Sequence, residues 1–148
     1  MSLILLVHHG AAVGPEVDPI RPLSSVGRAA TERLAGVAAA RGAKPDAMWH
    51  SGKLRARQTA ELFWKACNPL APLTAERGLL PDDPPQWIHD RLIGETRSIL
   101  IAGHMPYLPR LLALLTRTST AIEFPLHGCV ALETDDGGSW KEIWRLEQ

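Results

Sequence analysis

The run from Leu3 to Gly10, which reads Leu-Ile-Leu-Leu-Val-His-His-Gly, constrains the fold more than any other stretch of the chain. Its five consecutive apolar residues show no polar alternation, and this predicts a strand buried on both faces in the middle of a parallel sheet. In open α/β sheets, ligands bind beyond the carboxyl ends of the strands. His8 and His9 directly follow the apolar run and are therefore the first candidates for chemistry.

Strand and helix patterns alternate through most of the chain, which predicts a three-layer α/β/α sandwich with a mainly parallel central sheet. Apolar spacing, capping residues and prolines indicate the helices, and short apolar runs indicate the strands. We expect helices from Ser24 or Ser25 to about Gly42, from Leu54 to about Cys67, from Asp83 to about Ile93 and from Pro106 onward, and strands at 47–50, 98–102 and, weakly, 73–76.

The end of the chain resembles a β-hairpin. Strands are expected at 130–134 and 140–146, around the turn residues 135–138. Trp140 and Trp144 are an even number of residues apart, so both are expected on the same face of the second strand.

The overall composition favours a single domain spanning 1–148 in a reducing compartment. The chain has 148 residues, with 16 basic and 16 acidic side chains, so its net charge gives no reason to expect nucleic acid or an anionic membrane as a partner. Cys67 and Cys129 have no metal-ligand spacing, and the apolar amino-terminal run is too short for a signal peptide or a membrane span. We expect a cytoplasmic protein, and its oligomeric state does not follow from the sequence.

Polar side chains follow three of the predicted strands. His8 and His9 follow the first, Ser51 and Arg55 the second, and His104 the third. If these strands are parallel neighbours, the three groups face one crevice, and helices begin just after two of the strands. Imidazoles, a guanidinium and a helix amino terminus together predict a phosphate site.

Four segments of the chain resemble the ordered motifs of the histidine phosphatase (phosphoglycerate mutase-like) superfamily. The short length and the Asp-x-x-Arg-Pro-Leu segment resemble its SixA-type phosphohistidine phosphatase branch. The resemblance covers about two thirds of the chain and implies a phosphoglycerate mutase-like fold. The segments are Val7-His8-His9-Gly10, Asp18-Pro19-Ile20-Arg21-Pro22-Leu23, Ser51-Gly52-Lys53-Leu54-Arg55-Ala56-Arg57-Gln58-Thr59-Ala60 and Ala102-Gly103-His104-Met105-Pro106.

The resemblance implies a phosphatase that works through a phosphohistidine intermediate on His9. Arg55 is then expected to hold the phosphoryl oxygens, His104 to donate a hydrogen bond to them, and Arg21 to add a second positive charge. No cofactor is implied. The expected substrate is phosphohistidine on a protein, and the alternative is a small phosphomonoester.

One position departs from the family pattern, because the residue before the nucleophile is His8 where the family has arginine. A neutral histidine offers one donor, so His8 is expected to bind phosphate more weakly than arginine does. Losing a charge-assisted contact of roughly 1.5 to 3 kcal/mol slows turnover roughly ten- to a hundredfold. The alternative function is therefore a weakly active or inactive phosphate- or phosphoprotein-binding protein.

Two further questions about the site concern its general acid and a metal ion. Asp82 is the candidate general acid, preferred to Asp83 because Asp83 is expected to begin a helix. His8, His9 and His104 are three imidazoles that suit zinc, but no carboxylate lies near them in sequence and the arginines repel a cation, so no metal is predicted. His127, before Gly128, is expected no closer than the rim of the pocket.

Overall fold

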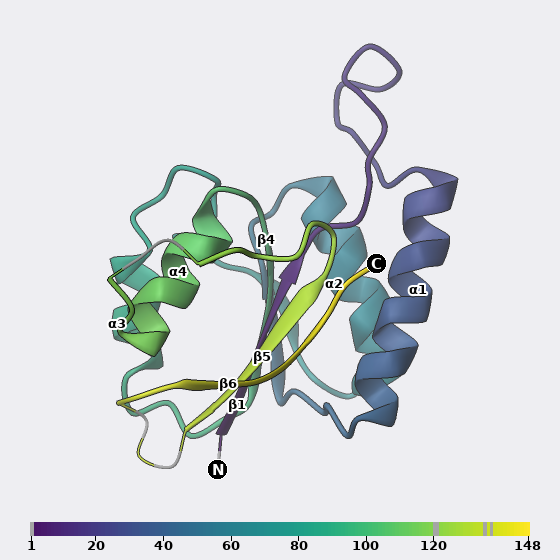
Figure 1. Cartoon of the computed structure of the whole chain (residues 1–148). Coiled ribbons are helices and arrows are strands. Elements are labelled where there is room, and N and C mark those ends of the chain that lie inside the picture. The colour runs from purple at the N-terminus through teal and green to yellow at the C-terminus, as the bar shows by residue number, and fades with distance from the viewer. Residues whose placement is uncertain (1, 120–121, 135, 137) are drawn as a thin grey trace.

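The central sheet confirms the predicted architecture, a mainly parallel sheet between two layers of helices (Figure 1). The computed structural model describes residues 2–119, 122–134, 136 and 138–148. Within these residues the sheet has six strands in the order β3-β2-β4-β1-β5-β6. Strands β1 to β4 are parallel, whereas β5 is antiparallel to its neighbours β1 and β6. The strands are β1 (Ser2–His8), β2 (Ala47–His50), β3 (Leu73–Ala75), β4 (Ile99–Gly103), β5 (Cys129–Thr134) and β6 (Lys141–Leu146).

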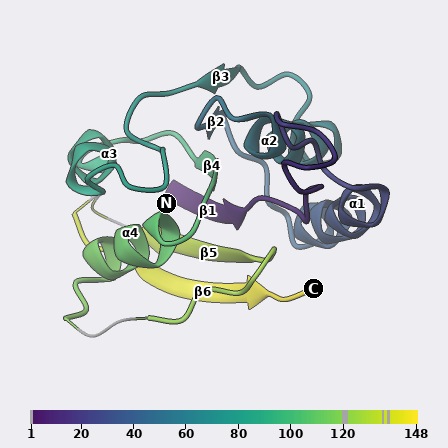
Figure 2. The same ribbon diagram turned by 90° about the horizontal axis from the view of Figure 1, so that it is seen from above.

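Helices cover both faces of this sheet, as Figure 2 shows. Helices α1 (Ser25–Ala40) and α2 (Leu54–Cys67) pack on one face, and α3 (Gln86–Leu92) and α4 (Tyr107–Thr116) pack on the other. Leu5 points into the core under α1 and α2, whereas Ile4 points into the core under α3 and α4. Burial on both faces explains why β1 is apolar without alternation from Leu3 to Val7. Within the described residues, no helix is long and apolar enough to cross a membrane.

Helix α3 begins later than the sequence predicts. The first helical residue is Gln86, and the two prolines before it form the turn that leads into the helix. Asp83 lies in the preceding loop, where its carboxylate accepts a hydrogen bond from the N–H of Leu80 at 3.0 Å. That bond closes a local turn, which competes with the helix for the residues before Gln86. Helix α1 starts as predicted, with the Ser24 hydroxyl accepting the N–H of Gly27.

The expectation that Trp140 and Trp144 share one face is wrong. Trp140 lies before β6 and is buried in the core under α3 and α4, whereas Trp144 packs against the core under α1 and α2. The pairing of β5 with β6 shifts between Ala131 and Leu132, so that β6 carries one extra residue there. An extra residue in a strand turns the side chains beyond it to the other face of the sheet. Of the predicted turn, residues 135 and 137 lie outside the described residues.

The strand order brings the three polar strand ends together. Strands β2, β4 and β1 are adjacent and parallel, with Ala102 of β4 opposite His50 and Gly103 opposite His8. Their carboxyl ends therefore lie side by side at one edge of the sheet. The expectation that these strands are parallel neighbours is confirmed.

Candidate active site

His9 occupies the first position after β1, and its ring orientation is determined by the backbone. Its Nδ1–H donates a hydrogen bond to the carbonyl of Gly10 at 2.8 Å. Because a carbonyl only accepts, Nδ1 carries the proton of the neutral ring and Nε2 keeps its lone pair. Burial lowers the pKa of His9 to about 4, an effect that the nearby charge of Arg55 reinforces. The Nε2 atom is therefore an unprotonated nucleophile at neutral pH.

The loop after His9 is attached to helix α2 by the hydroxyl of Thr59. This hydroxyl accepts a hydrogen bond from the N–H of Gly10 at 3.0 Å and donates one to the carbonyl of Arg55 at 2.8 Å. A Cβ on Gly10 would clash with the side chain of Thr31 and press on the carbonyl of Gly27. The close approach that positions His9 therefore requires glycine at this point.

His104 follows β4 and lies against both His9 and the end of β2. Its ring centre is 5.2 Å from that of His9, and its Nε2 is 2.6 Å from the Oγ of Ser51, with which it forms a hydrogen bond. The residue is 1% exposed. Burial, followed by the charges of His9 and Arg55, lowers the pKa of His104 to about 3. His104 is thus a neutral, oriented hydrogen-bonding group beside the nucleophile.

Two arginines bring fixed positive charge to the histidines. Arg55 lies in the first turn of α2, and within the described residues its buried Nε has no hydrogen-bond partner. Arg21, on the loop after β1, donates from Nε to the carbonyl of Val13 at 3.0 Å and adopts a left-handed backbone with φ of 49°. Burial and then the charge of Arg21 lower the pKa of Arg55. Two guanidinium groups that act on each other electrostatically favour a bound anion.

His8 and His127 form a stacked pair next to the nucleophile. Their rings are 4.8 Å apart and 5° from parallel. The N–H of His127 donates to Nδ1 of His8 at 2.8 Å, and Nδ1–H of His127 donates to the carbonyl of His9 at 2.7 Å. Burial, and then the charge of His9, lowers the pKa of His8 to about 3. His127 therefore lies within the histidine cluster rather than at the rim of the pocket.

The position of His127 follows from strand pairing that the sequence does not reveal. Val7 of β1 is opposite Cys129 of β5, so the residues just before Cys129 must pass the end of β1. If the antiparallel pairing of β5 with β1 could be recognised in the sequence, it would place His127 beside His8.

A metal ion fits this cluster poorly. Among the described residues, His8, His9 and His127 are the group whose nitrogens lie close enough, within 4.8 Å of one another, to share an ion. Because Nδ1 of His8 accepts a backbone N–H, the other nitrogen of its neutral ring carries the proton and has no lone pair for a metal. The charges of Arg21 and Arg55 also act on His9 and oppose a cation.

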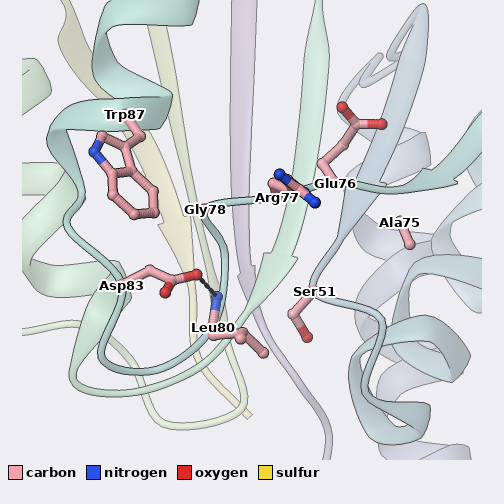
Figure 3. Close-up of a pocket in the computed structure, with 8 residues that line it drawn as sticks. All are labelled: Ser51, Ala75, Glu76, Arg77, Gly78, Leu80, Asp83 and Trp87. Atoms are coloured by element: carbon pink, nitrogen blue, oxygen red, sulfur yellow. Dashed lines mark hydrogen bonds between the residues drawn. The ribbon is translucent and has the colours of Figure 1, made fainter.

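A cavity of about 400 Å³ is lined in part by Ser51, the residue that hydrogen-bonds His104 (Figure 3). Trp87, which is 57% exposed, and Asp83 line it on one side, and Ser51 lies across from them. Asp82, the carboxylate preferred from the sequence, is exposed and does not line this cavity. The indole of Trp87 and the carboxylate of Asp83 therefore line the same cavity as Ser51, which hydrogen-bonds His104.

The strand order and the placement of the helices match the phosphoglycerate mutase-like fold of the histidine phosphatases. The structure of the protein histidine phosphatase SixA complexed with tungstate superposes with a TM-score of 0.87 at 22% identity, covering 98% of this chain and 96% of that one. A putative SixA from Agrobacterium tumefaciens has a TM-score of 0.80 at 21% identity, covering 99% of this chain and 98% of that one.

A more distant neighbour is the ecdysone phosphate phosphatase of Bombix mori in complex with tungstate. It has a TM-score of 0.73 at 12% identity, covering 97% of this chain and 92% of that one. No protein-family model and no curated protein matches the sequence. The expected resemblance to the histidine phosphatase superfamily, including its SixA-type members, is therefore confirmed at the level of the fold.

Proposed function

We propose that this protein is a phosphatase that transfers a phosphoryl group to Nε2 of His9 and then to water. The observation that carries the proposal is the hydrogen bond from Nδ1 of His9 to the carbonyl of Gly10, which leaves Nε2 unprotonated among cationic groups. A neutral imidazole is a good nucleophile, and a covalent intermediate divides one difficult displacement into two easier ones.

In the first step, the Nε2 lone pair of His9 attacks phosphorus and the bond from phosphorus to the leaving group breaks. Arg55 and Arg21 balance the negative charge on the transferred oxygens, and His104 lies close enough to His9 to contact the same group. In the second step, water attacks phosphorus, the bond to Nε2 breaks, and His9 recovers its lone pair. Inorganic phosphate is the product.

The leaving group departs with an electron pair and requires a proton. Asp83 lines the cavity beside Ser51, so it is better placed than Asp82 to supply that proton. The exposed indole of Trp87 provides a flat apolar wall for a ring. We therefore favour phosphohistidine on a protein as the substrate, since its leaving group is a planar imidazole that departs readily once protonated. The likeness to SixA supports the same choice.

Small phosphomonoesters are the second candidate substrates. The cavity has room for a small organic leaving group, and the fold is shared with a phosphatase for ecdysone phosphate. Binding of phosphate or phosphoprotein without turnover is the third candidate, because His8 contributes no permanent charge. The cytoplasmic location stays a prediction of the sequence.

The experiment that separates an enzyme from a binding protein compares the unmodified protein with His9→Ala. We expect hydrolysis of an aryl phosphate that falls roughly a thousandfold or more in the variant. Rapid mixing followed by quenching in alkali, where phosphohistidine survives, is expected to trap phosphate on His9. Comparing rates on a phosphohistidine-bearing protein and on a panel of phosphomonoesters then identifies the substrate class.

Two results would contradict the proposal. Binding of phosphate without hydrolysis of any substrate would leave the phosphate-binding alternative. Full activity in His9→Ala would exclude the covalent route. His89→Ala is a suitable control, because His89 lies on α3, pairs with Asp90 and does not line the cavity.

A further inference from the structure

We propose that His127 is an additional phosphate-binding residue, which contacts the bound anion in its protonated, cationic form. The inference rests on the proposed function for the nature of the anion. It starts from the four imidazoles at the strand ends, those of His8, His9, His104 and His127, whose ring centres are between 4.4 and 5.9 Å from a neighbour. The hydrogen bonds of these rings determine which of them can carry a positive charge.

His8 cannot become charged without losing a hydrogen bond. Its Nδ1 accepts the backbone N–H of His127 at 2.8 Å, so a proton on Nδ1 would point at another proton. The ring is also buried, which disfavours the charged form. His8 therefore supplies at most one neutral donor, from its other nitrogen.

The rings of His9 and His104 are also poorly suited to carry the extra proton. A second proton on His9 would occupy Nε2, the lone pair that attacks phosphorus. In His104, Nε2 is engaged with Ser51, and the buried Nδ1 has no hydrogen-bond partner within the described residues. A cationic His104, protonated on both nitrogens, would thus carry a buried Nδ1–H without an acceptor.

His127 has neither obstacle. Its Nδ1–H donates to the carbonyl of His9, so protonation of Nε2 keeps every hydrogen bond that the residue makes. The side chain is half-buried, and its ring centre is 5.9 Å from that of His9. A phosphoryl group on His9 is therefore close to His127.

The backbone supports a function for this position. His127 has a left-handed backbone with φ of 53°, which few residues other than glycine adopt without strain. Gly128 follows at a point where a Cβ would clash with the carbonyl of Leu146 and with Pro125. Such strain at a candidate site indicates that the tertiary structure holds the ring in place.

The charges around His127 link anion binding to proton uptake. Arg55, Arg21 and the imidazoles of His8, His9 and His104 face the cluster, while Glu123, Arg145 and Glu147 line a neighbouring pocket beside Leu126. Positive neighbours oppose a further charge on His127, whereas a bound dianion favours it. Because the two binding events are thermodynamically linked, the anion must bind more tightly at a lower pH, where His127 takes up the proton more readily.

The test measures sulfate binding by calorimetry at about pH 6 and about pH 8.5, on either side of the ordinary histidine range. Sulfate remains a dianion across this range and mimics phosphate in shape. The proteins are the unmodified chain, His127→Asn, His127→Arg and the control His89→Asn. Asparagine tolerates the left-handed backbone, and arginine restores a charge that does not depend on pH.

We expect the unmodified protein and His89→Asn to bind sulfate roughly tenfold more tightly at the lower pH. His127→Asn is expected to bind weakly at both pH values, and His127→Arg tightly at both. A His127→Asn variant that keeps the tenfold pH dependence would overturn the proposal. So would an unmodified protein whose affinity does not change with pH.

A second measurement requires no variant. In the NMR spectrum of the unmodified protein, the ring signal of His127 is expected to move to its protonated position when sulfate is added near neutral pH. A signal that stays at the neutral position contradicts the proposal. Because neither measurement depends on turnover, the inference can hold even if the protein hydrolyses no phosphate compound, a result that would refute only the proposed function.

Discussion

The backbone N–H of Gly10 donates a hydrogen bond to the hydroxyl of Thr59, which lies 49 residues further along the chain. The same hydroxyl donates to the carbonyl of Arg55. Thr59 is fully buried, so no water can replace either contact. The Thr59 hydroxyl therefore links the loop that carries His9, the proposed nucleophile, to helix α2, which carries Arg55, the proposed phosphate-binding residue.

We expect Thr59→Val to lower both stability and activity. Valine has nearly the same shape but leaves the buried N–H of Gly10 without an acceptor, which costs about 1–3 kcal/mol of unfolding free energy. Aryl phosphatase kcat/KM is expected to fall roughly tenfold or more, because His9 and Arg55 lose their relative position. Thr59→Ser keeps the hydroxyl and is expected to retain most of the stability and most of the activity. Equal behaviour of the two variants in denaturant titration and in kinetics would refute this role.

The pH dependence of activity is expected to reflect the low pKa of His9. Burial holds this pKa at about 4, so the nucleophile of the free enzyme stays unprotonated until the solution is more acidic than about pH 5. The measurement is kcat/KM for an aryl phosphate, expressed per concentration of the substrate dianion. An acid limb near the ordinary histidine pKa of about 6.5 would show that His9 is not held in this state.

The stability of the protein is expected to decrease with acidity because of His8 and His104. Burial lowers the pKa of both residues from 6.5 to about 3. Between these values the unfolded chain binds protons that the folded chain does not, so the unfolding free energy falls as the pH falls below about 6.5. Each group contributes at most about 1.4 kcal/mol per pH unit.

Denaturant titrations over this pH range are expected to show a smaller decrease of the unfolding free energy in His8→Asn than in the unmodified protein. The side-chain oxygen of asparagine can still accept the N–H of His127. An identical decrease in that variant would mean that His8 is not one of the groups responsible.

Two glycines of α1 are expected to respond oppositely to alanine. A Cβ on Gly27 would collide with the backbone of Ala11, in the loop after the nucleophile, whereas a Cβ on Gly36 meets nothing within 4 Å. Gly27→Ala is expected to lower the unfolding free energy by about 1–3 kcal/mol and to reduce activity. Gly36→Ala is expected to raise it by about 0.5–1 kcal/mol and to leave activity unchanged. Thermal unfolding of both variants checks this, and stabilisation by Gly27→Ala would contradict the close packing of helix and loop.

Several features of the fold are predictable because they depend on local pattern. Apolar runs without alternation identify β1 and β4 as strands buried on both faces, and a serine followed by helical spacing identifies the start of α1. The chemistry-bearing residues follow these strands directly, so a parallel arrangement suffices to place His9 and His104 near each other. The placement of these two rings, 5.2 Å apart, agrees with that expectation.

Other features depend on contacts between distant segments, which local pattern does not encode. Pairing of β5 with β1 brings His127 onto His8, and one extra residue in β6 separates Trp140 from Trp144. The turn closed by Asp83 delays the start of α3.

The sequence by itself determined the kinds of element, their order and the residues at the strand ends. Tertiary structure alone decided which nitrogen of His8, His9 and His127 carries the proton, because the carbonyls and N–H groups that orient those rings come from strand pairing and from the backbone geometry of the loops.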